Sequence, residues 1–133
     1  IKPDLAIAVD VGVAYDVPGM TSEKNQGNLG DGPLVIMMDA TSIAHDGFRK
    51  HIKEVAEAHH IPVQWATTPG GGTDAGSIHV ANEGIPTITI GVPLRYMHSN
   101  VSVMHTDDYE NSVQLITEIV RSLNDDSYQS LMW

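Results

Sequence analysis

Short apolar runs that alternate with segments of helical period are the feature that most constrains the fold of this chain. The runs are rich in Val, Ile and Thr and are bounded by polar, glycine or proline residues, a pattern typical of buried strands. They cover Leu5–Ala14, Leu34–Met38, Val63–Thr67 and Thr87–Val92, and a shorter one covers Val101–His105. The sequence therefore predicts four buried strands and a short fifth one.

Three helices are predicted between and after these strands. The first begins at Asp46, which is placed to cap it, and ends before a proline. The second is short, covers about residues 74–82, and follows the tight glycine loop Pro69–Gly72. The last begins near Asp107, with Glu110 three residues on as in a capping box. Its apolar face is expected to contain Val113, Ile116, Ile119, Val120 and Leu123.

Strands that are apolar along their length and alternate with helices indicate an α/β fold with a mainly parallel sheet. The 133 residues are about one domain's worth of chain, without an internal repeat or a long linker. The stretch Pro18–Pro33, rich in Gly, Ser, Asn and charged residues, predicts an exposed loop. In such sheets ligands bind beyond the carboxyl ends of the strands, so polar residues there are the candidates for function.

Composition excludes several classes of function. A formal net charge of −10 argues against nucleic-acid binding, which needs clustered Lys and Arg. The absence of cysteine rules out disulfides and thiolate metal sites and fits a cytoplasmic location. No apolar run approaches the roughly 20 residues of a membrane span, and no signal peptide stands at the start. Because the chain opens at Ile1, almost directly in a strand, we expect it to be an internal part of a longer protein.

Asp10 interrupts the first apolar run. A carboxylate inside a buried strand is costly unless it is paired, hydrogen-bonded or bound to a cation. Two interpretations follow: Asp10 binds a metal ion, or it is a structural residue satisfied by backbone N–H groups or by an arginine. Asp16 lies further along the chain, before Val17 and Pro18, and is expected in a turn.

His98 follows the strand Thr87–Val92, where a parallel sheet opens its ligand crevice. Imidazole is a common ligand of zinc-like ions, so His98 is a candidate metal ligand, and the alternative is an ordinary loop histidine. Arg95 lies between this strand and His98. It is suited to hold a substrate carboxylate or to orient a metal-binding one, and it is equally suited to a structural ion pair.

The run GGGTDA at residues 70–75 fits the pattern G-x-G-x-x-A of a dinucleotide-binding loop between a strand and a helix. However, it follows the third strand, and no acidic residue lies about 20 residues on to hold a ribose. Asp74, at the start of the helix, would also repel a pyrophosphate. The alternative is a tight turn in which Thr73 or Asp74 caps the helix. Asp74, like Arg95, is a further candidate for contacting a substrate or supporting a metal ligand.

Six short segments occur in a defined order along nearly the whole chain. They are AVDV at residues 8–11, DVPG at 16–19, GGTDA at 71–75, IPT at 85–87, IGVP at 90–93 and RYMHS at 95–99. Together they resemble the tetrahedral aminopeptidases, a cobalt- or zinc-dependent family that includes glutamyl and leucyl aminopeptidases and members once labelled endoglucanases. Each segment alone is a weak signal, but the ordered set is specific.

The resemblance implies a three-layer metallopeptidase domain of the zinc-exopeptidase type with two divalent metal ions per active site, zinc, cobalt or manganese. The aspartate at the position of Asp10 would bind one ion, and the histidine at the position of His98 the other. The family's remaining ligands, its catalytic glutamate and an inserted dimerisation domain lie N-terminal of this region and match no residue here. Residues 1–133 would then be the C-terminal part of a catalytic domain and inactive alone.

For the intact enzyme, the resemblance implies removal of N-terminal residues from short peptides by a metal-activated water, in a homo-oligomer commonly of twelve subunits. Two alternatives remain open. One is a related hydrolase that acts on another amide or on a glycan, although glycoside hydrolysis needs a carboxylate pair that the sequence does not single out. The other is a non-catalytic module that binds a nucleotide at the glycine loop.

Overall fold

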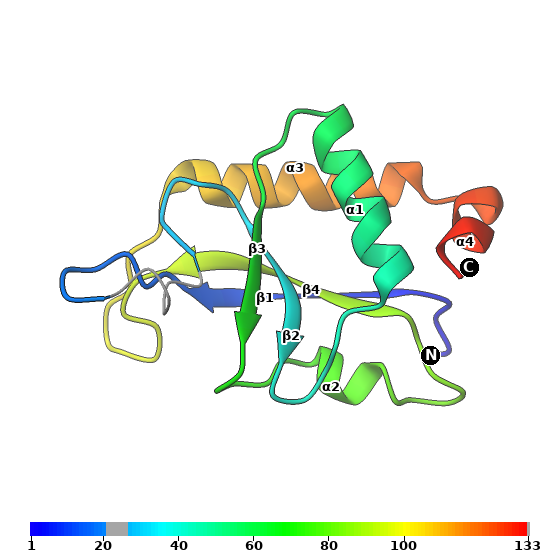
Figure 1. Cartoon of the computed structure of the whole chain (residues 1–133), viewed down its shortest axis with the longest axis horizontal. Helices are drawn as coiled ribbons and strands as arrows, with labels where there is room; N and C mark the ends of the chain where they lie inside the picture. Colours follow the sequence, from blue (N-terminus) through cyan, green and yellow to red (C-terminus); the bar gives the residue numbers. More distant parts are fainter. Residues whose placement is uncertain (21–26, 133) are drawn as a thin grey trace.

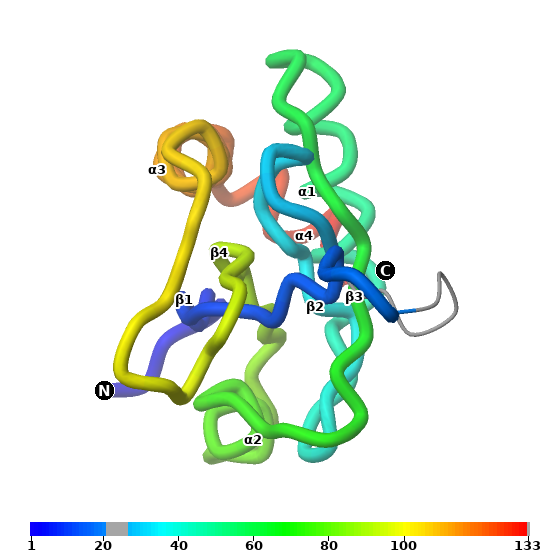
Figure 2. Tube along the Cα trace, turned by 90° about the vertical axis from the view of Figure 1, so that its left-hand side faces the viewer, coloured from blue at the N-terminus to red at the C-terminus, as the bar shows by residue number. Residues whose placement is uncertain are grey.

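The computed structural model describes residues 1–20 and 27–132, and it contains one four-stranded sheet between helices (Figure 1). The elements in chain order are β1 (Ala6–Val13), β2 (Leu34–Asp39), α1 (Asp46–Ala58), β3 (Gln64–Thr68), α2 (Ala75–Ile78), β4 (Thr87–Leu94), α3 (Thr106–Ser122) and α4 (Asp125–Leu131). Figure 2 shows α1, α3 and α4 on one side of the sheet and α2 on the other. The predicted three-layer α/β architecture is confirmed. None of the helices described is both long and apolar enough to cross a membrane.

The sheet has the strand order β1-β4-β2-β3 and is mixed. β1 is parallel to β4 and β2 is parallel to β3, whereas β2 and β4 are antiparallel. The sheet is therefore mainly parallel, as predicted, with one reversal at its centre. As a consequence, the carboxyl ends of β1 and β4 lie together at one end of the sheet, and those of β2 and β3 point the opposite way.

The main core lies between the sheet and the helices α1, α3 and α4. Its buried side chains come from β2, β4 and these helices and include Val35, Phe48, Ile52, Ile88, Ile90, Leu115, Ile119 and Leu131. Each side chain of this size contributes about 1.5 to 3 kcal/mol when fully buried. A second, small cluster of Leu34, Ile36 and Ala66 lies on the other face. On this face a Cβ on Gly12 would come within 2.3 Å of Leu34 Cδ1, so a larger residue at position 12 would force the buried Leu34 side chain to move.

The helices differ from prediction mainly at their ends. His45, not Asp46, caps α1, because its Nδ1 accepts a hydrogen bond from Phe48 N. α3 has His105 at the N-cap position rather than a capping box with Glu110. A capping box does occur at Asn124, where it starts α4, a helix that the sequence reasoning missed. α2 has only four residues, 75–78, and does not extend to residue 82.

The predicted apolar face of α3 is only partly correct. Ile119 is buried, but Val113 and Val120 are about half exposed, and Leu115 is fully buried instead. The inward face also carries the polar residues Asp108 and Ser112. Ile116 and Leu123 are partly buried against the core, as predicted. Asp108 and Ser112 occupy another part of the buried face, which the apolar period alone could not mark.

Two predicted segments take a different form. Val101–His105 is no strand, because only Val103 pairs, in an isolated bridge to Arg95. The loop Pro18–Pro33 is partly outside the described residues, at 21–26. Its second part is not exposed throughout, since Gly27, Gly32 and Pro33 are buried.

Candidate active-site cavity

A cavity of about 380 Å³ lies beside Ile36, a member of the small cluster on the face of the sheet away from the main core. It is lined by the second half of β1 with Asp10, by the loop after β4 with Met97 and His98, and by the glycine loop Gly70–Gly72 with Thr73. The two predicted metal ligands therefore come together in one cavity, although 87 intervening residues separate them in the sequence. They do so because β1 and β4 are parallel neighbours.

Asp10 is exposed in this structure, so the expectation of a buried carboxylate was wrong. The physical reason is its neighbourhood: β1 is an edge strand, and Asp10 pairs with Gly91, which has no side chain to cover it. The Oδ1 atom accepts a hydrogen bond from Val11 N at 2.7 Å. Among the described residues no arginine or other side chain is bonded to this carboxylate, which leaves Asp10 able to bind a cation in the cavity.

His98 is held by a closed loop. The backbone groups of Arg95 and Val103 exchange two hydrogen bonds at its base, of 2.9 and 3.2 Å. Ser99 Oγ contacts the carbonyl oxygens of Tyr96 and Val101 at 2.6 Å inside it. Tyr96 and His98 both have left-handed backbone, with φ of 62° and 64°. Non-glycine residues adopt this conformation mainly where their surroundings impose it, so the loop fixes the backbone from which the His98 side chain reaches the cavity.

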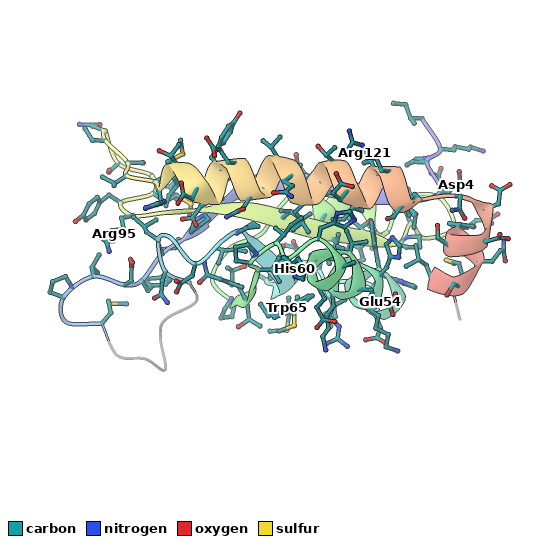
Figure 3. The ribbon with its side chains drawn as sticks, turned by 90° about the horizontal axis from the view of Figure 1, so that it is seen from above. Asp4, Glu54, His60, Trp65, Arg95 and Arg121 are labelled. Carbon is teal, nitrogen blue, oxygen red and sulfur yellow. The ribbon has the colours of Figure 1, made fainter. Side chains whose placement is uncertain are left out.

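Arg95 forms the ion pair that the sequence left as one of three interpretations. Its Nε and Nη2 each donate to a different oxygen of Asp16, both at 2.7 Å. This guanidinium holds the pKa of the Asp16 carboxyl below its ordinary value. Figure 3 shows Arg95 at the end of the molecule where the loops after β1 and β4 lie. The pair thus ties the loop after the strand of Asp10 to the loop of His98, and Arg95 itself does not line the cavity.

We expect Arg95→Met to lower the free energy of unfolding by about 1 to 2 kcal/mol, because it leaves a largely buried carboxylate without its cation. The side chain of Asp16 is only 17% exposed. Arg121→Met is the matched control, since Arg121 is 71% exposed in its pair with Glu118 and should cost less than about 0.5 kcal/mol. Urea unfolding of both variants measures the difference, and equal losses would contradict a structural role specific to the Asp16–Arg95 pair.

The glycine loop is not organised as a phosphate-binding loop. α2, which follows it, has a single turn and offers few oriented N–H groups to an anion. Asp74 stands at the N-cap position of α2 without a side-chain cap hydrogen bond, and it is exposed outside the cavity. Thr73 does not cap the helix by its side chain either. Its hydroxyl lies 2.8 Å from Asp39 Oδ2 and 2.9 Å from Thr89 Oγ1.

Asp39 is a residue that sequence reasoning missed. It ends β2, is 5% exposed, and accepts hydrogen bonds from Thr41, Ser42 and Thr73. Burial by itself would raise its pKa, but the hydrogen bonds from Thr41, Thr73 and Ser42 outweigh burial and lower the pKa to about 2. The signal was present: an Asp directly after a buried strand, with Thr and Ser two and three residues on, is typical of a turn closed by the Asp side chain.

The comparison with protein families decides the relationship. The model for M42 glutamyl aminopeptidase matches residues 1–115. The chain belongs to this family. A candidate aminopeptidase of Acetivibrio thermocellus is 40% identical to it over 120 residues, which are 90% of this chain and 36% of the relative. The glutamyl aminopeptidase of Lactococcus lactis subsp. cremoris is 35% identical over 123 residues, 92% of this chain and 33% of the relative.

Solved structures of two peptidases and of a protein described as an endoglucanase have the same fold. Aminopeptidase APDkam598 of Desulfurococcus kamchatkensis superimposes with a TM-score of 0.94 at 34% identity, over 98% of this chain and 37% of that one. The TET1 peptidase of Pyrococcus horikoshii, which can assemble into a tetrahedron or a large octahedral shell, has a TM-score of 0.71 at 27% identity, over 89% and 34%. A Thermotoga maritima protein described as an endoglucanase has a TM-score of 0.67 at 28% identity, over 95% and 35%. The chain thus spans about a third of the length of the relatives it matches.

Proposed function

We propose that residues 1–133 are the C-terminal part of the catalytic domain of a dinuclear metalloaminopeptidase that removes N-terminal residues from short peptides. The observation that carries the proposal is the meeting of Asp10 and His98 in one cavity, in a chain of the M42 family. Asp10 lies on β1 and His98 lies in the loop after β4, the parallel neighbour of β1. Both side chains are exposed and line the cavity.

The donor set fits the proposed metal ions in kind but not in number. Carboxylate and imidazole are ligands that zinc, cobalt and manganese all accept. Within residues 1–20 and 27–132, no group of three or more His, Cys, Asp or Glu side chains is placed to hold an ion. Asp10 would hold one ion and His98 the other, and the remaining ligands and the catalytic glutamate would come from sequence outside these residues. When bound, two such metal ions would lower the pKa of a water molecule in the site.

The partners follow from the same proposal. A peptide with a free amino terminus is the substrate, and the first-residue preference would depend partly on the rest of the enzyme. Assembly into a large homo-oligomer, a dodecamer by family resemblance, is supported by the tetrahedral assembly of the TET1 peptidase. A cytoplasmic location stays a prediction that rests on the absence of cysteine.

One observation favours the alternative that the enzyme acts on a glycan: the similar structure from Thermotoga maritima is described as an endoglucanase. Its chemistry needs two carboxyl groups flanking the sugar bond. Asp10 supplies the only carboxylate among the described residues that line the cavity. The nucleotide alternative is disfavoured by the single-turn helix after the glycine loop. The amide-cleaving enzyme therefore remains the function that these residues support best.

The test uses the full-length protein that contains these residues. We expect it to cleave aminoacyl p-nitroanilides, to lose this activity when a chelator removes the metal, and to regain it with zinc or cobalt. Cellulose-derived oligosaccharides should not be hydrolysed. Calorimetric titration with NAD and with ATP should give no saturable binding signal. Chelator-resistant glycan cleavage, or metal-independent nucleotide binding near Gly70, would replace the proposed function by the corresponding alternative.

The 133 residues alone should bind metal weakly and be catalytically inactive. Each ion would find one ligand here, Asp10 or His98, and a single ligand supplies only a small part of the roughly 10 to 16 kcal/mol that a full set of ligands gives a structural zinc ion. We expect a dissociation constant on the order of 10 µM or weaker, measured by titrating zinc or cobalt into the isolated chain. One tightly held ion per chain in elemental analysis would contradict this division of ligands.

A further inference from the structure

Asp39 is a buried, ionised group that the proposed metal chemistry does not use. Its two carboxylate oxygens take different partners. Oδ1 accepts from Thr41 N, Thr41 Oγ1 and Ser42 N at 2.7 to 2.8 Å, which closes the turn after β2. Oδ2 accepts from Thr73 Oγ1 at 2.8 Å, 34 residues away in the sequence. One oxygen thus serves the local turn, and the other reaches the end of the glycine loop.

Thr73 connects Asp39 to the centre of the sheet. Because a hydroxyl has a single proton and Asp39 can only accept, Thr73 donates to Asp39 and accepts from Thr89 Oγ1 at 2.9 Å. Thr89 is 2% exposed and lies on β4, two residues before Gly91, the pairing partner of Asp10. The three side chains form a directed chain of hydrogen bonds from β4 through the glycine loop to the end of β2.

The turn that Asp39 closes holds the glycine loop at two further points. Ala40 N donates to Gly71 O at 2.8 Å. The side chain of Thr41 fills the space beside Gly72 and Gly76, where an added Cβ would lie 2.8 Å from Thr41 Cγ2 and 2.2 Å from Thr41 Oγ1 respectively. Asp39 therefore controls the loop directly through Thr73 and indirectly through residues 40 and 41.

The part of the loop held in this way faces the cavity. Gly70, Gly71, Gly72 and Thr73 all line it together with Asp10 and His98. A Cβ on Gly70 or Gly71 would meet nothing within 4 Å, so the loop leaves room for a ligand. In the described part of the chain, the backbone groups of Gly70 and Gly72 make no hydrogen bond. Free backbone donors and acceptors beside an open cavity suit the main chain of a peptide.

We propose that the glycine loop binds the main chain of the peptide substrate and that Asp39 is its positioning residue, acting through Thr73. The proposal rests on the proposed peptidase function. Asp39 and Thr73 touch neither Asp10 nor His98 by any hydrogen bond, so they act on substrate binding and not on the metal ligands. A loss of this positioning should raise KM and leave the metal content of the enzyme unchanged.

The test compares Thr73→Val with Thr73→Ser in the full-length protein. Valine keeps the size of the side chain but removes the hydroxyl, whereas serine keeps the hydroxyl and removes a methyl group. With the aminoacyl p-nitroanilide that the unmodified enzyme cleaves fastest, we expect Thr73→Val to raise KM about tenfold or more, with kcat changed less than about threefold. Thr73→Ser should stay within about twofold of the unmodified enzyme in both constants, and Asp39→Asn should fall between the two.

Two readouts accompany the kinetics: metal content by elemental analysis, and hydrogen exchange of the segment 69–76 measured by mass spectrometry. Faster exchange in Thr73→Val but not in Thr73→Ser, at constant metal content, supports the proposal. An unchanged KM in Thr73→Val would overturn the proposal, whether or not the variant melts at a lower temperature. The only role left to Asp39 would then be to stabilise the turn after β2. A loss of metal would overturn it as well. If the unmodified enzyme cleaves no aminoacyl substrate, the proposed function fails, while the exchange data still decide whether Asp39 and Thr73 position the loop.

Discussion

Asp10→Ala and His98→Ala, each introduced separately into the full-length protein, should lower kcat/KM for an aminoacyl p-nitroanilide by about 10³-fold or more. Metal ions stabilise developing charge by several kcal/mol, and 4 kcal/mol corresponds to about a factor of 10³ in rate. Both side chains are exposed, and in the part of the chain that the structure describes neither has an ion pair. Their removal should therefore change the free energy of unfolding by less than about 0.5 kcal/mol. Alanine at position 98 retains a Cβ, so the left-handed backbone there is not relieved.

Asp126→Ala and His60→Ala are the matched controls, because Asp126 is an exposed aspartate of α4 and His60 is an exposed histidine that follows α1 and shares the left-handed backbone of His98. Both helices lie on the opposite side of the sheet from α2. Both variants should retain full activity. Elemental analysis should find less metal in the Asp10 and His98 variants than in the controls. If both site variants keep their peptidase activity, the assignment of these residues as ligands is wrong.

The sequence singled out two candidate ligands that the structure brings into one cavity, but it did not predict the geometry around them. The ordered motifs singled out Asp10 and His98, and parallel pairing of β1 with β4 brings both to one cavity. The four apolar runs form strands as predicted, but only β2 and β4 are buried along most of their length. β1 and β3 are the edge strands of the sheet and are partly exposed, with Val9 of β1 62% exposed. The expectation that Asp10 is buried failed, because burial depends on the neighbour across the sheet, and that neighbour is a glycine far along the chain.

The features that sequence reasoning could not supply are those set by pairing direction and by long-range polar contacts. The reversal between β2 and β4 places the glycine loop at the opposite end of the sheet from the His98 loop, yet both line the cavity. No local pattern encodes such a reversal. Asp39 binds a residue 34 positions away, and Asp108 binds residues 76 and 78 positions away. In the sequence, an Asp such as Asp108 interrupts the apolar period of a helix, so it is not recognised as part of the buried face until its hydrogen-bond partners are known.

Asp108→Ala should lower the free energy of unfolding by about 2 to 4 kcal/mol, a larger loss than that expected for Arg95→Met. Asp108 is completely buried on α3, and its two carboxylate oxygens accept hydrogen bonds of 2.8 Å from Gly30 N and Gly32 N. Alanine would leave the buried N–H of Gly32 without an acceptor, which costs about 1 to 3 kcal/mol. Gly30 is exposed, so the loss of its hydrogen bond costs less, and the space left by the buried carboxyl adds a cavity term. Both glycines have left-handed backbone, and a Cβ on Gly32 would lie 2.3 Å from Pro62 O, so the loop has little freedom to find other partners.

Asp107→Ala provides the control, since Asp107 lies in the same helical turn, carries the same charge and is 72% exposed. Its loss should cost no more than about 0.5 kcal/mol, the usual contribution of an acidic side chain near a helix N-terminus. Asp108→Asn should fall between the two, because an amide keeps one acceptor oxygen and presents N–H donors to the other backbone N–H. Urea unfolding of the three variants measures the series. Leu29 N also donates a hydrogen bond to Asp16, the partner of Arg95. If Asp108→Ala releases the loop that contains Leu29, we expect the Asp16–Arg95 ion pair to weaken as well. Equal midpoints for Asp108→Ala and Asp107→Ala would show that the buried carboxylate does not hold the loop.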